Sequence, residues 1–365
     1  MSEVTRTAFD GVQRALGCEF MDWEGWTWPS DFGDAAGEHH AVRTAVGVWD
    51  ASPLRKWTFH GKDALLAADR IFTNDMLGLE VGQIRYAPFC DEPGKMVGDG
   101  TVFKFAEDAC EVVTALDSDL DHFREVVGGL DVTIENVTER HPHLQLQGPR
   151  SRELLSSLCP ADVAGLRYFR FFPEPVRVGG VPCHVSRTGY SGELGYELFC
   201  APEHAEELWG GLTGAGATPY GLAAVETIRI ESGLIFIGYD YFAHETDPFD
   251  MSLDKLIRFD TGDFHGKQAL QRTAAAPPRR LVTLTVDGSD VPEYGAAVTV
   301  AGEPAGTLTS PCESPTLARV IGLACLETRF AAPGTAVEVA LGDGTVPAAV
   351  EPLSIYDPVK ARPRS

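Results

Sequence analysis

The feature that most constrains this chain is a glycine-rich string that begins at Ser186, ends at Glu197 and reads SRTGYSGELGYE. Glycine recurs at every third position, with two tyrosines and two glutamates between the glycines. Glycine permits positive φ angles and a close approach of the backbone to a ligand, and tyrosine offers a flat apolar face. A carboxylate such as that of Glu197 accepts two parallel hydrogen bonds. The string therefore suits either a structural turn, which spacing alone favours, or a site for a flat, nitrogen-rich heterocycle such as a pterin.

Length and charge limit what the chain can be. Its 365 residues exceed a single simple core, so we expect two or three domains. The formal net charge of −23 opposes binding to nucleic acid and to anionic membranes, so neither is an expected partner. The sequence has no run of about 18 apolar residues and no apolar signal segment at its start, which predicts a cytoplasmic protein without a membrane span.

The cysteines and histidines predict neither a disulfide framework nor a metal site. The eight cysteines are scattered and none forms C-x-x-C, so we expect reduced, mostly buried thiols. His39 and His40, like His141 and His143, lack partners at the spacings typical of metal ligands.

Hydrophobic periodicity predicts an α+β fold rather than a doubly wound parallel sheet, because hairpins alternate with helices. Strands are predicted at 57–60, 101–105, 110–115 and 144–147, and helices at 38–46, 62–77, 120–127, 150–158, 202–211 and 223–232. A linker is predicted at 274–280, where small residues precede a proline pair. Beyond it, short strands at 281–286, 297–300, 320–325, 336–340 and 346–350 predict a small antiparallel β domain.

Motifs along nearly the whole chain resemble those of the glycine-cleavage T-protein family. These proteins are tetrahydrofolate-dependent aminomethyltransferases, with relatives that demethylate other small molecules. The string at 186–197 is similar to the family signature S-R-T-G-Y-[ST]-G-E-x-G-[FY]-E. Further matches, in order, are Gly25-Trp26 with Pro29, Glu38 to Arg43, Val46 to Asp50 with Ser52, Asn74-Asp75, Gln147-Gly148-Pro149, Thr309-Ser310, Ser314-Pro315-Thr316 and Tyr356-Asp357-Pro358.

The resemblance implies a pseudo-threefold arrangement of two mixed α/β domains and a C-terminal antiparallel β-barrel. The folate-binding region would cover 1–273, with one domain formed by about 1–50 together with 140–273 and the other by 51–139. The barrel would cover 281–365, after the linker at 274–280. Tetrahydrofolate would lie in a central channel between the domains.

The resemblance also implies roles for individual residues. Asp99 matches the carboxylate beside the folate nitrogens, where an anion stabilises positive charge and handles a proton. Without the resemblance, Gly98-Asp99-Gly100 is typical of an Asp-Gly turn. Arg229 matches an arginine that helps to clamp folate, and its alternative role is a pair with Glu226 on a helix surface. The implied folate-binding residues are Tyr86, Asp99, Phe103, Thr114, Tyr190, Glu197 and Arg229.

Several positions depart from the aminomethyltransferase pattern around the reacting carbon. Gly98, Phe103, Thr114, Val225 and the pair Pro53-Leu54 replace the residues usual in those enzymes. The segments Ser52-Pro53-Leu54, Cys90-Asp91, 99–103 and Asp240-Tyr241 resemble instead the demethylases that act on methoxy or N-methyl compounds.

Demethylation needs an acid that protonates a poor leaving group. Candidates for it are Tyr241, Tyr239 and His60, each of which is otherwise a packing or surface residue. Trp23, Trp26 and Trp28 predict either an aromatic pocket or plain core.

The sequence thus predicts an enzyme that moves a methyl group from a small O- or N-methylated compound to tetrahydrofolate. One alternative is glycine-cleavage-type aminomethyl transfer, which forms 5,10-methylenetetrahydrofolate and ammonia and has a lipoyl carrier protein as partner. A related biosynthetic one-carbon transferase is a variant of that alternative. Another is a non-catalytic folate-binding protein, although the K-G-C-x-x-G-Q-E motif of such relatives is missing here. The donor, the oligomeric state and the pathway stay open.

Overall fold

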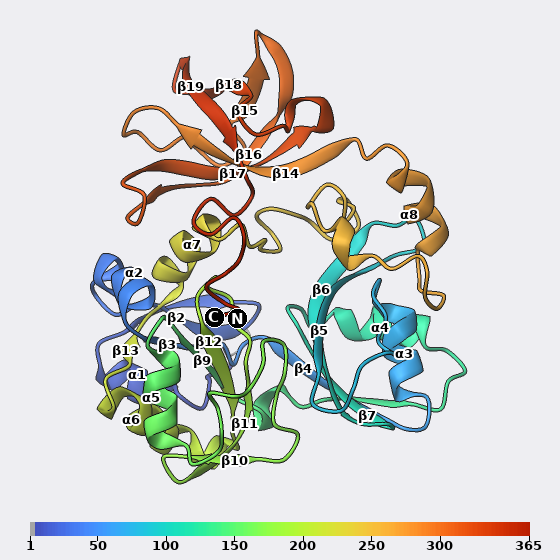
Figure 1. The fold of residues 1–365 in the computed structure, drawn as a ribbon, viewed down its shortest axis with the longest axis vertical. Coiled ribbons are helices and arrows are strands. Elements are labelled where there is room, and N and C mark those ends of the chain that lie inside the picture. Colours follow the sequence, from blue (N-terminus) through green and yellow to red (C-terminus); the bar gives the residue numbers. More distant parts are fainter. Residues whose placement is uncertain (1–3) are drawn as a thin grey trace.

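The computed structural model describes residues 4–365 and shows three units around a common centre (Figure 1). One unit is built on a six-stranded sheet and one on a five-stranded sheet, while the third is a closed six-stranded barrel. This confirms the predicted combination of two mixed α/β units and an antiparallel β-barrel. None of the helices in the described range combines the length and apolar character needed to cross a bilayer.

The six-stranded sheet joins two separate stretches of the chain in the order β10-β11-β12-β9-β3-β13. Alternate side chains, such as those of Leu144, Leu146 and Leu198, pack against α5 and α6, as a strand period of two requires. A hairpin of β1 and β2 adjoins this unit, and α2 packs on α7. The elements are α1 (Asp10–Ala15), β1 (Glu19–Trp23), β2 (Trp26–Asp31), α2 (Ala35–Thr44), β3 (Gly47–Asp50), β9 (His143–Gln147), α5 (Ser151–Leu158), β10 (Val176–Val178), β11 (Val181–Ser186), β12 (Gly195–Phe199), α6 (Ala205–Gly214), β13 (Thr218–Pro219) and α7 (Leu222–Glu231).

The five-stranded sheet is formed by one continuous stretch and has the order β5-β6-β7-β4-β8. Trp57, Phe59 and Val112 on its outer face form a core with α3 and α4. The elements are β4 (Arg55–His60), α3 (Ala64–Ile71), β5 (Ile84–Cys90), β6 (Met96–Ala106), β7 (Ala109–Thr114), α4 (Asp119–Val126) and β8 (Thr133–Asn136).

The helix predicted at 62–77 is shorter in the structure, because α3 ends at Ile71. Phe72 takes an extended conformation and forms a bridge with Phe89. The Asp69 carboxylate accepts the N–H groups of Met76 (2.8 Å) and Leu77 (3.3 Å), which stabilises a turn in place of a further helical turn.

The two sheets turn their inner faces toward each other. Phe103 and Val113 of the five-stranded sheet pack against Phe199 and Phe171 of the other unit. We call the layer between these two inner faces the intersheet layer. The alternation that sends Trp57 and Phe59 outward places Lys56 of the same strand on this inner side.

The barrel closes in the order β14-β17-β16-β15-β18-β19. Residues 275–278 connect it to α8 (Lys267–Ala274), and Arg279, expected in the linker, is already the first residue of β14. The five predicted strands are present, but β16 was not predicted. The barrel strands are β14 (Arg279–Val286), β15 (Ala297–Val300), β16 (Glu303–Ser314), β17 (Arg319–Glu327), β18 (Ala336–Leu341) and β19 (Gly344–Glu351).

The C-terminal segment, 352–365, leaves the barrel and returns to the six-stranded unit, as Figure 1 shows in dark red. Arg187 donates to the carbonyl of Pro363 (3.2 Å). Tyr356 lies between two guanidinium groups, those of Arg43 (4.0 Å from its ring centroid) and Arg362 (4.6 Å). The segment therefore ties the barrel to the glycine-rich string.

Candidate active site

Asp99 lies within β6, where it pairs with Pro88 of β5, so the prediction of an Asp-Gly turn at 98–100 is wrong. The side chain accepts a hydrogen bond from the Tyr86 hydroxyl (2.8 Å) and one from the Tyr241 hydroxyl. Tyr86 comes from β5, while Tyr241 comes from the loop after α7. The structure thus brings together three residues that the sequence had singled out separately.

Burial has the largest effect on the pKa of the Asp99 carboxyl. It raises the pKa of Asp99, while the hydrogen bonds from Tyr241 and Tyr86 act in the opposite direction. Burial and the neighbouring Asp99 charge also raise the pKa values of Tyr86 and Tyr241 well above their usual range. Asp99 therefore holds a proton more readily than an exposed aspartate does. The two phenols are weak acids whose protons point at Asp99, so they hold the carboxylate in place.

Glu197 lies on β12 and is held by three donors. The Gln145 amide donates to it (3.0 Å), as do the hydroxyls of Ser186 (3.4 Å) and Thr188. Burial raises the pKa of Glu197, and these hydroxyls lower it. Gln145 also accepts the backbone N–H of Tyr190 (3.0 Å), so one amide aligns the carboxylate and the tyrosine.

The glycines of the string at 186–197 have a structural role that the sequence did not reveal. A Cβ atom on Gly189 or Gly195 would lie 2.1 Å from the Gln147 side chain. Gln147 in turn donates to the carbonyl oxygens of Thr188 and Tyr196 (both 3.2 Å) and accepts from Ser191 (2.6 Å). Two of the three glycines thus make room for Gln147, which pins the string to β9.

The side chains of two other predicted folate-binding residues, Phe103 and Thr114, contact other side chains of the protein. Phe103 is buried in the intersheet layer against Phe171 and Phe199. The hydroxyl of Thr114 accepts the indole N–H of Trp57 (2.9 Å), whose ring belongs to the outer core. Gly98 also has a packing reason, because a Cβ atom there would lie 2.6 Å from the ring of Phe89.

Arg229 is fully buried, so the expectation that it pairs with Glu226 on a helix surface is wrong about the surface position. The pair itself exists, with Nε–Oε2 at 2.7 Å. Its remaining donors bind the Asp240 carboxylate (2.6 Å), the Ser310 hydroxyl (2.8 Å) and the carbonyl of Leu234 (3.2 Å). All five N–H groups are used within the chain. Arg229 therefore anchors the loop that carries Tyr241 to the barrel.

The structure does not bring His60 to Asp99. His60 is exposed at the far end of β4, five residues or about 16 Å of strand from the end where Arg55 pairs with Thr114. Of the three tryptophans, Trp28 and Trp26 are buried, and the indole of Trp28 donates to the carbonyl of Asp50 (2.6 Å). Trp23 is half-buried beside Phe236.

Two buried residues of the intersheet layer were missed by the sequence analysis. Lys56 is fully buried, and burial lowers its pKa to about 7. His143, also fully buried, has no hydrogen-bond partner for either ring nitrogen. The available signal was the strand period of two, which places Lys56 opposite to Trp57 and His143 on the same face as Gln145.

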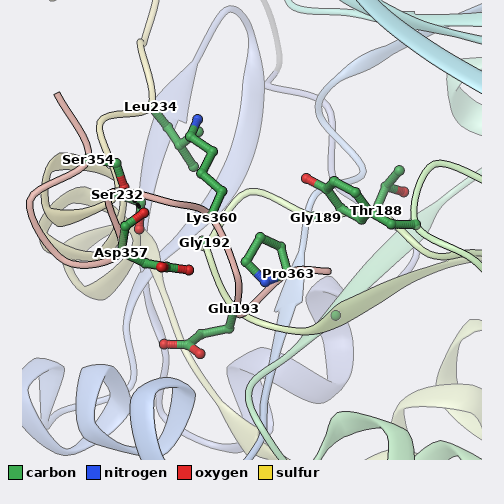
Figure 2. Close-up of a pocket in the computed structure, with 12 residues that line it drawn as sticks. Thr188, Gly189, Gly192, Glu193, Ser232, Leu234, Ser354, Asp357, Lys360 and Pro363 are labelled. Atoms are coloured by element: carbon green, nitrogen blue, oxygen red, sulfur yellow. Dashed lines mark hydrogen bonds between the residues drawn. The ribbon is translucent and has the colours of Figure 1, made fainter. Parts of the chain in front are cut away.

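The outer side of the glycine-rich string carries a small pocket (Figure 2), with a volume of about 40 Å³. Figure 2 shows Asp357, Lys360 and Pro363 of the C-terminal segment gathered against Gly192 and Glu193. Such a volume holds only a few waters, so this side of the string is covered by the chain's own terminus.

The intersheet layer has the chemistry that a reduced folate requires. Glu197 offers a buried acceptor for N–H groups, and Tyr190, which shares the partner Gln145 with it, adds an aromatic ring. His143, with both ring nitrogens unpaired, lies 3.8 Å from the Glu197 carboxylate. Since buried polar groups are rarely left without partners, these side chains fit a polar heterocycle in this layer.

Comparison with known proteins agrees with this architecture. Residues 9–261 match the GCVT N-terminal domain, and 279–357 match the glycine cleavage T-protein C-terminal barrel domain. An aminomethyltransferase from Streptomyces coelicolor is 38% identical, with 92% of each chain covered. A trimethylamine-oxide aldolase from Ruegeria pomeroyi is 37% identical over 95% of this chain, which spans 46% of that relative.

Among solved structures, the aminomethyltransferase T of the glycine cleavage system from Bartonella henselae has the same fold. The TM-score is 0.88 at 22% identity, with 96% of this chain and 98% of that chain covered. The family matches together span most of the sequence. The chain therefore belongs to the glycine-cleavage T-protein family of folate-dependent one-carbon transferases.

Proposed function

We propose that this protein transfers a methyl group from a small O- or N-methylated compound to tetrahydrofolate. The observation that carries the proposal is the Asp99 carboxylate, held by Tyr86 and Tyr241 at the intersheet layer. When bound, tetrahydrofolate supplies a nucleophilic N5 that accepts the one-carbon unit.

The chain's own residues provide binding and proton handling. Glu197 accepts N–H groups of the pterin edge, and Tyr190 lies beside it through their shared partner Gln145. Methyl transfer releases a proton on the acceptor side and needs one on the departing oxygen or nitrogen. Asp99, whose pKa is raised by burial, holds that proton between the two events. Tyr241 then serves to position Asp99 rather than to protonate the leaving group directly.

Two lines of support favour a methyl donor. Gly98 and Val225 replace residues that the aminomethyltransferase pattern carries. The similarity to a trimethylamine-oxide aldolase, named for an N-methylated compound, points in the same direction.

The second candidate is aminomethyl transfer from a lipoyl carrier protein, with release of ammonia. Its support is the 38% identity to an aminomethyltransferase over nearly the whole chain. A non-catalytic folate-binding protein would not need the Asp99 arrangement, which counts against that third alternative.

One chromatographic assay separates these functions. The protein is incubated with tetrahydrofolate and a panel of O-methyl and N-methyl compounds, or with an aminomethyl-lipoyl donor. We expect 5-methyltetrahydrofolate and the demethylated compound, each dependent on both reactants. Formation of 5,10-methylenetetrahydrofolate with ammonia would replace the proposal by the second candidate. Folate binding without any product would indicate the non-catalytic alternative.

A further inference from the structure

The intersheet layer contains hydrogen-bonding capacity that the chain itself does not use. Lys56 reaches this layer from β4, and its Nζ donates to one acceptor, the carbonyl oxygen of Ser52 (2.8 Å). An ammonium carries three N–H donors, so two stay available. The side chain is fully buried, where unused donors are costly.

His143 and Lys56 are neighbours because both form a hydrogen bond with Ser52. The Ser52 hydroxyl accepts the backbone N–H of His143 (3.1 Å), while the Ser52 carbonyl accepts Lys56. The imidazole stacks on Phe199, with 4.6 Å between ring centroids, and points its edge toward Glu197. Both of its ring nitrogens are buried and unpartnered. Two adjacent side chains from different sheets thus present unmet hydrogen bonds to the same place.

We propose that Lys56 recognises the 4-carbonyl oxygen of the folate's pterin ring, while Glu197 accepts from the N–H groups next to it. This inference rests on the proposed function. It names the pterin substituent that the site selects, and it assigns Lys56 as a binding residue.

The chemistry of the ligand matches that of the layer. The pyrimidine edge of a 2-amino-4-oxopterin presents two neighbouring N–H donors followed by a carbonyl acceptor. A carboxylate complements the donors, and an ammonium complements the carbonyl by a charge-assisted hydrogen bond. Glu197 and Lys56 supply this pair from opposite sheets. Among the described residues, Lys56 and Glu197 form no ion pair with each other, and the one hydrogen bond of the Nζ goes to Ser52.

The charges around Lys56 support its role. Asp50 on β3, Glu111 on β7 and Glu197 on β12 favour its charged form, while burial and Arg55 on β4 oppose that form. Lys56 and Glu197 are each within range of the other's charge, and Lys56 lowers the pKa of His143 further below its usual value. A ligand carbonyl adds an acceptor for the ammonium and so favours its charged state.

The test compares tetrahydrofolate with its 4-amino-4-deoxy analogue, which has a donor in place of the carbonyl. Calorimetry on the wild-type protein should show a preference for the 4-oxo compound of about 10-fold or more, because the wrong group leaves buried donors facing each other. In Lys56→Met the preference should fall by about 3-fold or more. The part that remains reports Glu197, because the 4-amino ring also lacks the proton on the ring nitrogen next to C4. The matched control is Lys104→Met, since Lys104 is also buried in the five-stranded sheet but is paired with Glu107 (2.8 Å) and the Leu79 carbonyl (3.0 Å).

The outcomes separate the inference from the proposed function. Absence of any tetrahydrofolate binding by the wild-type protein would overturn the proposed function. Binding with an unchanged 4-oxo preference in Lys56→Met would overturn the inference alone, and would assign the free donors of Lys56 to a buried water.

A second measurement decides the matter if Lys56→Met does not fold. The 4-oxo preference of the wild-type protein should decline as the pH rises through about 7, because the ammonium then loses its proton. A preference that stays constant from pH 6 to pH 9 would contradict the inference.

Discussion

At the scale of single residues, we expect turnover to depend most on the side chain of Asp99. Asp99→Asn keeps the shape of the side chain but removes the negative charge and the proton acceptor, and it leaves one of the two tyrosine hydroxyls facing an amide N–H group. We expect turnover to fall by about 10²-fold or more. Steady-state kinetics with the active donor would measure it, with thermal unfolding as the check on folding. Near-normal turnover would show that the carboxylate has no part in the reaction.

A variant of Tyr241 can show whether this residue donates the proton to the leaving group or only positions Asp99. Its hydrogen bond lowers the pKa of Asp99, so Tyr241→Phe should raise that pKa and move the acidic limb of the pH–rate profile to higher pH. Folate affinity should be unchanged. If Tyr241 were itself the proton donor, the variant would lose activity at every pH without a shift of the limb.

We expect folate affinity to depend most on Glu197. Glu197→Ala would leave the pterin N–H groups without an acceptor, which costs about 1–3 kcal/mol of binding free energy. Calorimetry with a reduced folate measures the loss. Glu203→Ala, a change at an exposed glutamate beyond β12, is the control and should bind normally. Normal affinity in Glu197→Ala would refute the assignment.

At the scale of elements, hydrophobic periodicity predicted the strands and helices that depend mainly on nearby residues. The strands of the barrel other than β16 alternate in hydrophobicity, and all were found. β16 was missed because Pro304, Gly306 and Pro311 interrupt its pattern, and the barrel's hydrogen bonds to β15 and β17 override that local signal. In the same way, α3 was predicted too long because the contact of Phe72 with Phe89 lies far away in sequence.

The residues of the candidate site also fall into two groups, those that a family motif predicted and those that only the structure revealed. The association of Asp99 with Tyr241 could be reached only through family motifs, since 142 positions separate them in the chain. Arg229 illustrates the limit of such motifs, because its five donors are already satisfied by Asp240, Glu226, Ser310 and Leu234. Neither Lys56 nor His143 lies in a motif, and only the pairing of two sheets makes them neighbours.

Glu231 joins three elements and should make their packing sensitive to acid. It lies at the end of α7 and accepts Arg43 and His39 of α2 and the Ser314 hydroxyl of β16 (2.6 Å). Burial alone would raise its pKa, but His39 and Arg43 together hold the pKa at about 2, against 4.5 in an unfolded chain. This depressed pKa contributes stability that is fully present above about pH 4.5 and is lost as the pH falls through about 2.

Glu231→Gln should therefore lower the free energy of unfolding by about 2–4 kcal/mol at pH 7. The difference from the wild-type protein should shrink as the pH falls from about 4.5 to about 2. Denaturant unfolding at several pH values measures both effects. The control is Glu313→Gln, at an exposed glutamate of β16. A difference that does not vary with pH would show that the hydrogen bonds of Glu231, and not its charge, carry the stability.

At the scale of the whole molecule, the net charge of −23 acts on every anionic ligand that approaches. A folate carries carboxylates, so the mean field of the protein repels it. Two cations near the glycine-rich string, Arg43 and Arg362, do not offset this field, because both are bound to Glu193 (3.0 and 3.3 Å). We therefore expect binding of a folate to be driven by short-range contacts in the intersheet layer against a long-range repulsion.

This balance predicts that added salt speeds up the association of a reduced folate. Added salt screens the repulsion, since the screening length falls from about 30 Å at 0.01 M to about 8 Å at 0.15 M ionic strength. The association rate of a reduced folate should therefore rise with salt, by about 2- to 10-fold over this range, whereas steering by opposite charges would make it fall. Stopped-flow tryptophan fluorescence would follow it. A tetrahydropterin without the glutamate tail is the matched control, because it lacks the carboxylates and should associate at a rate independent of salt. A folate rate that falls with salt would show that a local cationic path outweighs the field of the whole protein.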